Sequence, residues 1–222
     1  MNTKINEIFD SIQGEGPVVG YRQLFIRFCG CNLNCAYCDT DFVSGVEYSP
    51  EGLLGKISSE YDFNVFHSVS LTGGEPLLST GFLKEFLPLI KNKIKIYLET
   101  NATMYSEINE VKNYIDIISA DIKLKSAAGF DSFTLHEKFF ENSKGIQTFA
   151  KIVFDENITE EEVFKCVNLA QKFNIELILQ PKMSGNNITV SPDFCVNILN
   201  KFTAKHKNTR LIPQVHKFLN VI

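Results

Sequence analysis

Short apolar runs typical of β-strands alternate along this chain with segments of helical periodicity. Six such strand-then-helix units follow one another, which predicts parallel strand pairing with right-handed crossovers. The predicted strands are residues 21–28, 67–72, 93–100, 114–123, 146–154 and 175–181. The predicted helices are residues 50–61, 79–92, 104–113, 158–173 and 191–206, with a short one near 131–142 and an extended tail over 210–219. Six units are too few for a closed eight-unit barrel.

Composition limits the class of protein. The chain has 222 residues, 44% of them hydrophobic, which is enough for one sizeable core and predicts a single domain over 1–222. Its net charge is -4 and no basic stripe appears, so nucleic acid is not an expected partner. We expect no membrane span, because there is no apolar run of about 18 residues, and no signal peptide, because the N-terminus lacks a basic segment followed by an apolar run. Six cysteines in a chain of this size are not a small secreted disulfide scaffold, and reduced thiols fit the cytosol.

Cys31, Cys35 and Cys38 stand at C-x3-C-x2-C spacing within the polar segment CGCNLNCAYCDTDF, residues 29–42. Three thiolates can hold three irons of a [4Fe–4S] cube and leave the fourth iron open to a small molecule. A closed zinc site would need a distant fourth ligand, and unligated buried thiols would not need so polar a loop. Cys29 is ambiguous, because it stands two residues before Cys31, and it is more simply a packed thiol.

Polar side chains cluster where the predicted strands end. Gly73 and Gly74 of the LTGGEP segment end one strand and would let backbone groups approach a ligand closely. Other strand ends carry Ser119, Asp121, Lys123 and Gln180, and also Glu99, Thr100 and Asn101. Because parallel α/β folds gather their chemistry at the carboxyl ends of strands, we expect these residues at one mouth. Solvated strand ends would explain several of them equally well.

The two ends of the chain suggest a ligand with a polar ring. In SIQGEGPVVG, residues 11–20, Gln13 and Glu15 flank Gly14 and could pair with ring N–H groups, as on a 2-amino-pyrimidinone edge. Arg27 stands among Phe25, Ile26 and Phe28, where a buried guanidinium would require an anion. The tail adds Gln214, His216 and Lys217. A glycine-rich hairpin with a surface arginine is the simpler alternative.

The cysteine spacing, with Tyr37 before the last cysteine, together with LTGGEP, resembles the radical S-adenosylmethionine (SAM) superfamily. The resemblance implies an α/β fold, an incomplete, open parallel βα barrel of about six units, with a [4Fe–4S] cluster on Cys31, Cys35 and Cys38. It also implies SAM as a cofactor and a radical step. Gly74, Ser119, Asp121, Lys123 and Gln180 fall where that superfamily contacts SAM. The fourth strand has Ala120 and Asp121 where many relatives have proline and lysine.

With QGEGP before the cysteines, Cys38-Asp39-Thr40 at their end and a Gln-Val-His-Lys tail, the chain resembles the 7-carboxy-7-deazaguanine synthase family. The resemblance implies 6-carboxy-5,6,7,8-tetrahydropterin as substrate and a magnesium-dependent radical ring contraction with loss of ammonia, in biosynthesis of the queuosine deazapurine. SAM would be regenerated. A flavodoxin or ferredoxin would donate electrons, and the assembly would be a homodimer.

Carried over by position, the substrate contacts are Ile12, Gln13, Gly14, Glu15, Arg27, Thr72, His216 and the terminal carboxylate of Ile222. Thr40 would bind Mg²⁺, although the residues alone favour Asp39 or Asp41 as its ligand. A glycyl-radical-enzyme activating enzyme shares the cysteine spacing and is the enzymatic alternative; QGEGP and the His-Lys tail argue against it. A zinc- or cluster-binding interaction module is the non-enzymatic alternative.

Overall fold

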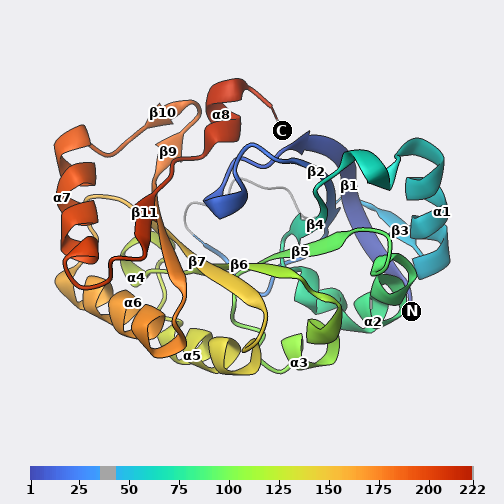
Figure 1. Cartoon of the computed structure of the whole chain (residues 1–222), viewed down its shortest axis with the longest axis horizontal. Helices are drawn as coiled ribbons and strands as arrows, with labels where there is room; N and C mark the ends of the chain where they lie inside the picture. Colours follow the sequence, from blue (N-terminus) through green and yellow to red (C-terminus); the bar gives the residue numbers. More distant parts are fainter. Residues whose placement is uncertain (36–43, 222) are drawn as a thin grey trace.

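One sheet of nine strands dominates the computed structural model, which describes residues 1–35 and 44–221 (Figure 1). The strand order is β11-β8-β7-β6-β5-β4-β2-β1-β3, and pairing is parallel from β2 to β11. The strands are β1 Thr3–Ile12, β2 Arg22–Phe28, β3 Val46–Tyr48, β4 Ser68–Gly73, β5 Lys95–Thr100, β6 Ile117–Ile122, β7 Gln147–Phe154, β8 Glu176–Pro181 and β11 Thr209–Leu211. A separate hairpin joins β9 Met183–Ser184 to β10 Asn187–Ile188.

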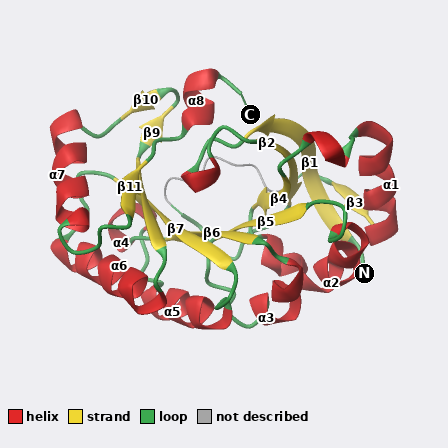
Figure 2. Cartoon of the chain, viewed as in Figure 1, coloured by secondary structure: helices red, strands yellow, loops and turns green. Residues whose placement is uncertain are grey.

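All described helices except the last follow the outer, convex side of this curved sheet, and the last one lies at its open side (Figure 2). The helices are α1 Pro50–Glu60, α2 Thr80–Ile90, α3 Ile108–Val111, α4 Lys125–Ala128, α5 Phe133–Asn142, α6 Glu160–Phe173, α7 Pro192–Thr203 and α8 Val215–Leu219. The main core lies between sheet and helices; Phe82 and Phe86 of α2, for example, stack at 5.5 Å and pack near Phe28 of β2. Burial of such faces holds each crossover helix against its strands.

Two helices begin at capping residues that are local in the sequence. The Ser49 hydroxyl accepts the Gly52 N–H at 3.1 Å, and Pro50 follows as the first residue of α1. Thr159 and Glu162 form a reciprocal capping box at the start of α6. These local signals fix where the two helices begin.

The open barrel is confirmed: the six predicted strands are β2 and β4 to β8, and β11 adds a seventh parallel strand. The sheet has two free edges, β3 and β11, among the strands of residues 1–35 and 44–221, so it does not close on itself. An antiparallel β1–β2 hairpin extends it at the N-terminal side. None of the helices in the described part of the chain is long and apolar enough to cross a bilayer.

Two local predictions are wrong. The tail is not extended throughout: β11 is followed by the helix α8, which ends at Asn220 in left-handed conformation (φ 52°). A helix of five residues is too short to show a helical period in the sequence. The helix predicted over 104–113 is reduced to α3 and a 3₁₀ turn over Lys112–Tyr114.

Candidate active site

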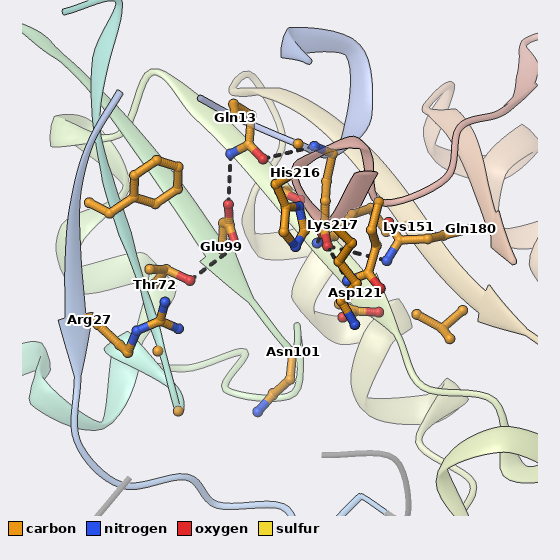
Figure 3. Close-up of a pocket in the computed structure, with 18 of the residues that line it drawn as sticks. Gln13, Arg27, Thr72, Glu99, Asn101, Asp121, Lys151, Gln180, His216 and Lys217 are labelled. Carbon is orange, nitrogen blue, oxygen red and sulfur yellow. Dashed lines mark hydrogen bonds and ion pairs between the residues drawn. The ribbon is translucent and has the colours of Figure 1, made fainter. Parts of the chain in front are cut away.

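A cavity of about 810 Å³ opens on the concave side, at the carboxyl ends of β2 and β4 to β8. The loop after β1 and the segment leading into α8 also border it (Figure 3). The predicted site residues that line it are Ile12, Gln13, Gly14, Glu15, Arg27, Cys31, Cys35, Thr72, Gly74, Ser119, Asp121, Lys123, Gln180 and His216. Residues up to 204 positions apart in sequence therefore share one chamber, counting from Ile12 to His216. Cys38, Thr40 and Ile222 lie outside the described residues.

The cysteine loop begins on one wall of the cavity. The Cys31 sulfur accepts the Leu33 N–H at 3.4 Å and lies 3.9 Å from Nδ2 of Asn101, at the end of β5. Asn101 also donates to Oδ1 of Asn32 at 2.8 Å, which ties the loop to that strand end. Within residues 1–35 and 44–221 no three potential metal-binding side chains come together, since the third motif cysteine is not among them. The Cys29 thiol instead donates to the Ser44 carbonyl at 3.3 Å.

Gly74 has a steric reason to be glycine. A Cβ there would lie 1.7 Å from the Gly30 carbonyl oxygen, a distance that no side chain tolerates. The Gly74 N–H donates to Phe28 O at 3.1 Å, and the Glu75 N–H donates to Gly30 O at 2.9 Å. The glycine pair therefore packs directly against the chain that leads into Cys31, and joins the two motifs found in the sequence.

Glu75 is fully buried behind this turn. Its carboxylate accepts hydrogen bonds from the N–H groups of Leu77 and Asn101 (3.1 and 2.8 Å) and from the Thr100 hydroxyl (2.9 Å). All of these donors are neutral. Burial raises the pKa of Glu75 to about 7, because the hydrogen bonds only partly replace the lost hydration of the charged form.

A buried histidine joins the ends of β5 and β6. His136 of α5 accepts the Lys123 N–H on Nε2 (3.1 Å), so its Nδ1–H donates to the Ala102 carbonyl (3.1 Å) and the ring is neutral. Burial lowers the pKa of His136 to about 4, which keeps it neutral. The Lys123 ammonium meanwhile pairs with Asp121 at 2.7 Å inside the cavity.

Among the residues that line the cavity, some buried oxygen atoms have no hydrogen-bond partner in the described part of the chain. Oδ1 of Asp121 and Oε1 of Gln180 make no hydrogen bond to any residue that the structure describes. Buried polar atoms without partners are rare in folded proteins, so their presence in a cavity points to a bound ligand.

Glu99 connects the residues predicted for the substrate (Figure 3). Its Oε1 accepts from the Gln13 amide at 2.9 Å, and its Oε2 accepts from the Thr72 hydroxyl at 3.0 Å. The same Gln13 amide also donates to Gln23 at 2.9 Å. Both N–H groups of Gln13 are therefore used within the protein, and its side-chain oxygen already accepts the Glu15 N–H at 2.9 Å, so only a second lone pair on that oxygen remains for a ring.

Glu15 is held by three side chains from distant segments. It forms an ion pair with Lys151 of β7, accepts from Gln214 at 2.8 Å, and accepts from Gln180 at 3.3 Å. Burial alone would raise the pKa of Glu15, but Lys151 and the hydrogen bonds lower it to about 2. Glu15 thus differs from Glu75, whose hydrogen-bond donors are all neutral and whose pKa is raised.

His216 lies directly against Gly14. A Cβ on Gly14 would be 2.1 Å from His216 Nδ1, and the Gly14 carbonyl accepts the Val215 N–H at 2.9 Å. The packing of the C-terminal segment therefore requires glycine at this position. Burial lowers the pKa of His216, so the imidazole is neutral near pH 7.

Arg27 corrects one expectation. Its side chain is not fully buried but 21% exposed, and it already has an acidic partner, since Nε lies 3.4 Å from Oε2 of Glu7. The guanidinium lies over the Phe9 ring at 5.1 Å, and that ring stacks on Phe25 at 4.9 Å. An anion in the cavity would meet a guanidinium positioned on an aromatic face.

Sequence reasoning missed three residues of the site. They are Lys151, His136, and Glu99 in its role as the shared hydrogen-bond acceptor of Gln13 and Thr72. The Lys151 signal was readable, because a lone lysine in the apolar run IQTFAKIVF must find a counter-charge when the strand is buried. Glu99 looked like an ordinary strand end. His136 stands in a helix whose partners are set only by packing.

Comparisons with known proteins agree with this geometry. Residues 25–192 match the family model of the radical SAM superfamily. The chain is 33% identical to 7-carboxy-7-deazaguanine synthase of Geobacter sulfurreducens over 97% of its length and 96% of that protein, and 34% identical to the synthase of Archaeoglobus fulgidus over the whole of both. Its fold is similar to that of QueE from Escherichia coli, with TM-score 0.67 and 22% identity, covering 97% of this chain and 95% of that one.

The fold, the paired motifs and the family model together define the class: the chain belongs to the radical SAM superfamily. Membership implies a [4Fe–4S] cluster and SAM, and the site fits them. Cys31, Cys35 and Gly74 line the cavity, and Asp121 and Gln180, which each have a buried oxygen with no partner among the described residues, line the same cavity.

Within that superfamily, the chain belongs to the 7-carboxy-7-deazaguanine synthase family. This assignment does not favour the alternative of a glycyl-radical-enzyme activating enzyme.

Proposed function

We propose that this chain, as one radical SAM domain over 1–222, converts 6-carboxy-5,6,7,8-tetrahydropterin into 7-carboxy-7-deazaguanine with loss of ammonia. The observation that carries the proposal is the single cavity in which the cysteine loop faces the Gln13–Glu15 loop and Arg27. Family membership supplies the reaction, and the cavity supplies room for both a cofactor and a bicyclic substrate.

Cys31, Cys35 and Cys38 would hold the cluster, and Gly74, Ser119, Asp121, Lys123 and Gln180 would hold SAM. When bound, this pair supplies a radical that removes a hydrogen atom from the substrate. Asp121, paired with Lys123, and Gln180 each have a buried oxygen available for hydroxyl or ammonium donors. Asn101 donates to Asn32 and so holds the start of the cysteine loop against the end of β5.

The opposite wall would hold the substrate through Ile12, Gln13, Gly14, Glu15, Thr72, His216, Ile222 and Arg27. The Arg27 guanidinium would bind the pterin carboxylate in competition with Glu7, which is 40% exposed and can turn to solvent. The ionised Glu15 would accept from a ring N–H, since a carboxylate can only accept. His216, neutral and half-buried, would cover the ring and keep water out.

Three further parts of the proposal depend on family resemblance. Mg²⁺ would bind the hydroxyl of Thr40 together with substrate oxygens. A flavodoxin or ferredoxin in the cytosol would supply the electron. The active form would be a homodimer.

Anaerobic turnover tests the proposal. Reconstituted protein is incubated with the pterin, SAM, Mg²⁺ and a reductant, and we expect 7-carboxy-7-deazaguanine and ammonia in equal amounts. Cys31→Ala is the matched control, because it removes a cluster thiolate and should give neither product. Release of deoxyadenosine without the deazaguanine, in the wild-type protein, would overturn the proposal.

A further inference from the structure

Lys151 is the most deeply buried cation in the cavity. Its side chain is 7% exposed, and it projects from the middle of β7, next to Asp121 in the register of the sheet. Carboxylates of Glu15, Glu99 and Asp121 lie around it, with the Tyr97 hydroxyl below. Their charges raise its pKa well above the ordinary lysine value, so it remains an ammonium. Nothing in the proposed reaction has yet used this charge.

The hydrogen bonds of Glu15 leave it little freedom. A carboxylate offers about four lone pairs. On Oε1, two are taken by Gln180 and Gln214, and on Oε2 one is taken by Lys151. The backbone N–H of Glu15 is occupied as well, because it donates to Oε1 of Gln13 at 2.9 Å. One acceptor position on Oε2 remains, and Lys151 determines its direction and its charge.

We propose that Lys151 is a positioning residue that makes the site specific for a ring with an N–H donor edge: it holds Glu15 as an oriented acceptor. The inference rests on the proposed function and extends it to the choice of ring. An ionised Glu15 binds the 2-amino-pyrimidinone edge of a pterin. It repels a lumazine, in which a carbonyl oxygen replaces the 2-amino group, because two acceptors then face each other.

Removing Lys151 should change this choice. Without the ammonium, the buried Glu15 takes up a proton more readily, and a carboxylic acid can donate to a carbonyl. His216 is the other titratable group facing Glu15, and it is already neutral near pH 7. A purely structural lysine would weaken pterin and lumazine equally, whereas an electrostatic one alters their ratio.

The test is equilibrium binding of 6-carboxypterin and 6-carboxylumazine, followed by ligand fluorescence, to cluster-loaded protein without reductant. We expect wild type to prefer the pterin and Lys151→Met to lose about 10- to 100-fold in pterin affinity, as for a lost charged hydrogen bond. The ratio of pterin to lumazine affinity should fall with it, and fall further from pH 7.5 to 5.5. Lys151→Arg should restore most of the preference.

A double-mutant cycle separates action through Glu15 from direct contact. Glu15→Gln should lose the preference by itself, and Glu15→Gln/Lys151→Met should be no worse, since Lys151 then has nothing to position. The double variant is also charge-neutral, so it keeps the test usable if Lys151→Met folds poorly. Lys91→Met, which breaks a lysine–Asp116 pair of 2.7 Å at the amino ends of the strands, is the matched control and should leave binding unchanged.

An unchanged pterin-to-lumazine ratio in Lys151→Met would overturn the inference, as would additive losses in the double variant. If wild type bound neither ring, the proposed function would fail, and the inference with it. If wild type bound the pterin with a preference that Lys151→Met kept, only the inference would fail.

Discussion

Two carboxylates, Glu75 and Glu15, are shielded from water in different parts of the molecule and differ in charge state: Glu75 is fully buried behind the glycine turn, whereas Glu15 lines the cavity. Glu75 receives only neutral donors, and burial raises its pKa to about 7. Glu15 is also buried, but Lys151 stands beside it and its pKa falls to about 2. Burial is the same in kind for both, so the nature of the partner decides which form of the carboxyl group is stable.

The two carboxylates also differ in how far their hydrogen-bond partners lie from them in sequence. Glu75 is bonded to Thr100 and Asn101, 25 and 26 residues away, within adjacent strand units. Glu15 is bonded to Lys151, Gln180 and Gln214, which are 136, 165 and 199 residues away. The surroundings of Glu75 are therefore assembled from neighbouring strand units, whereas those of Glu15 require the whole sheet to be in place.

The largest expected effect comes from disturbing the close packing of Gly74 beside Glu75. Gly74→Ala should lower the free energy of unfolding by about 3 kcal/mol or more, because its Cβ has no room beside the Gly30 carbonyl. Cluster content should fall as well. The measurements are urea unfolding and iron and sulfide content. Gly55→Ala, in the exposed interior of α1 with open space around it, should instead stabilise by about 0.5–1 kcal/mol; equal effects would contradict this.

The raised pKa of Glu75 predicts stability that declines with rising pH. The folded state binds the proton more tightly than the unfolded state, so stability is lost as pH rises from 4.5 to 7. Relative to Glu75→Gln, wild type should lose about 3 kcal/mol between pH 4 and 7.5. Urea unfolding of both proteins across this range measures the difference, from which the opposite contribution of His136 cancels. A difference that does not change with pH would show that Glu75 is already ionised.

The lowered pKa of Glu15 predicts the opposite sign. Here the unfolded state binds the proton more tightly, so stability is present above pH 4.5 and is lost as pH falls toward 2. Relative to the charge-neutral pair Glu15→Gln/Lys151→Met, wild type should lose about 2 kcal/mol between pH 5 and 3. The same unfolding experiment measures it. Parallel curves of stability against pH for the two proteins would show that the pKa of Glu15 is not lowered, and the contrast with Glu75 would be wrong.

Arg27→Ala tests whether the proposed substrate contacts can be weakened while the cluster is still assembled. Loss of the guanidinium should weaken binding of 6-carboxypterin by about 10-fold or more, because a charged hydrogen bond to its carboxylate is lost. Iron and sulfide content should be unchanged. Arg22→Ala, whose guanidinium is 54% exposed and pairs with Asp10, is the matched control. Loss of the cluster in Arg27→Ala would mean that substrate binding and cluster assembly cannot be separated at this residue.

The smallest effect provides a reference for stability alone. Thr159→Ala removes the hydroxyl of the capping box at the start of α6 and should cost about 1 kcal/mol. Neither pterin binding nor cluster content should change, because the helix start lies outside the cavity. A change in ligand preference would show that preference follows global stability and is no specific property of the Lys151–Glu15 pair.

Much of the fold could be predicted because its signals are local. The six parallel strands follow from apolar runs of limited length, and the starts of α1 and α6 follow from Ser49 and Thr159. The α8 helix could not be predicted, because five residues show no period. Gly74 was recognised as a close approach, but the Gly30 carbonyl as its neighbour required the turn and the cysteine loop to be folded together.

The sequence by itself predicted a cysteine motif, a glycine turn and a series of parallel strand ends that meet at one mouth, because spacing and periodicity are properties of short segments. It also required that Lys151 and Glu15, if buried, be paired. Only the tertiary structure decided that they pair with each other, since the partner of a buried charge is set by strand register and by the packing of both chain ends at the cavity.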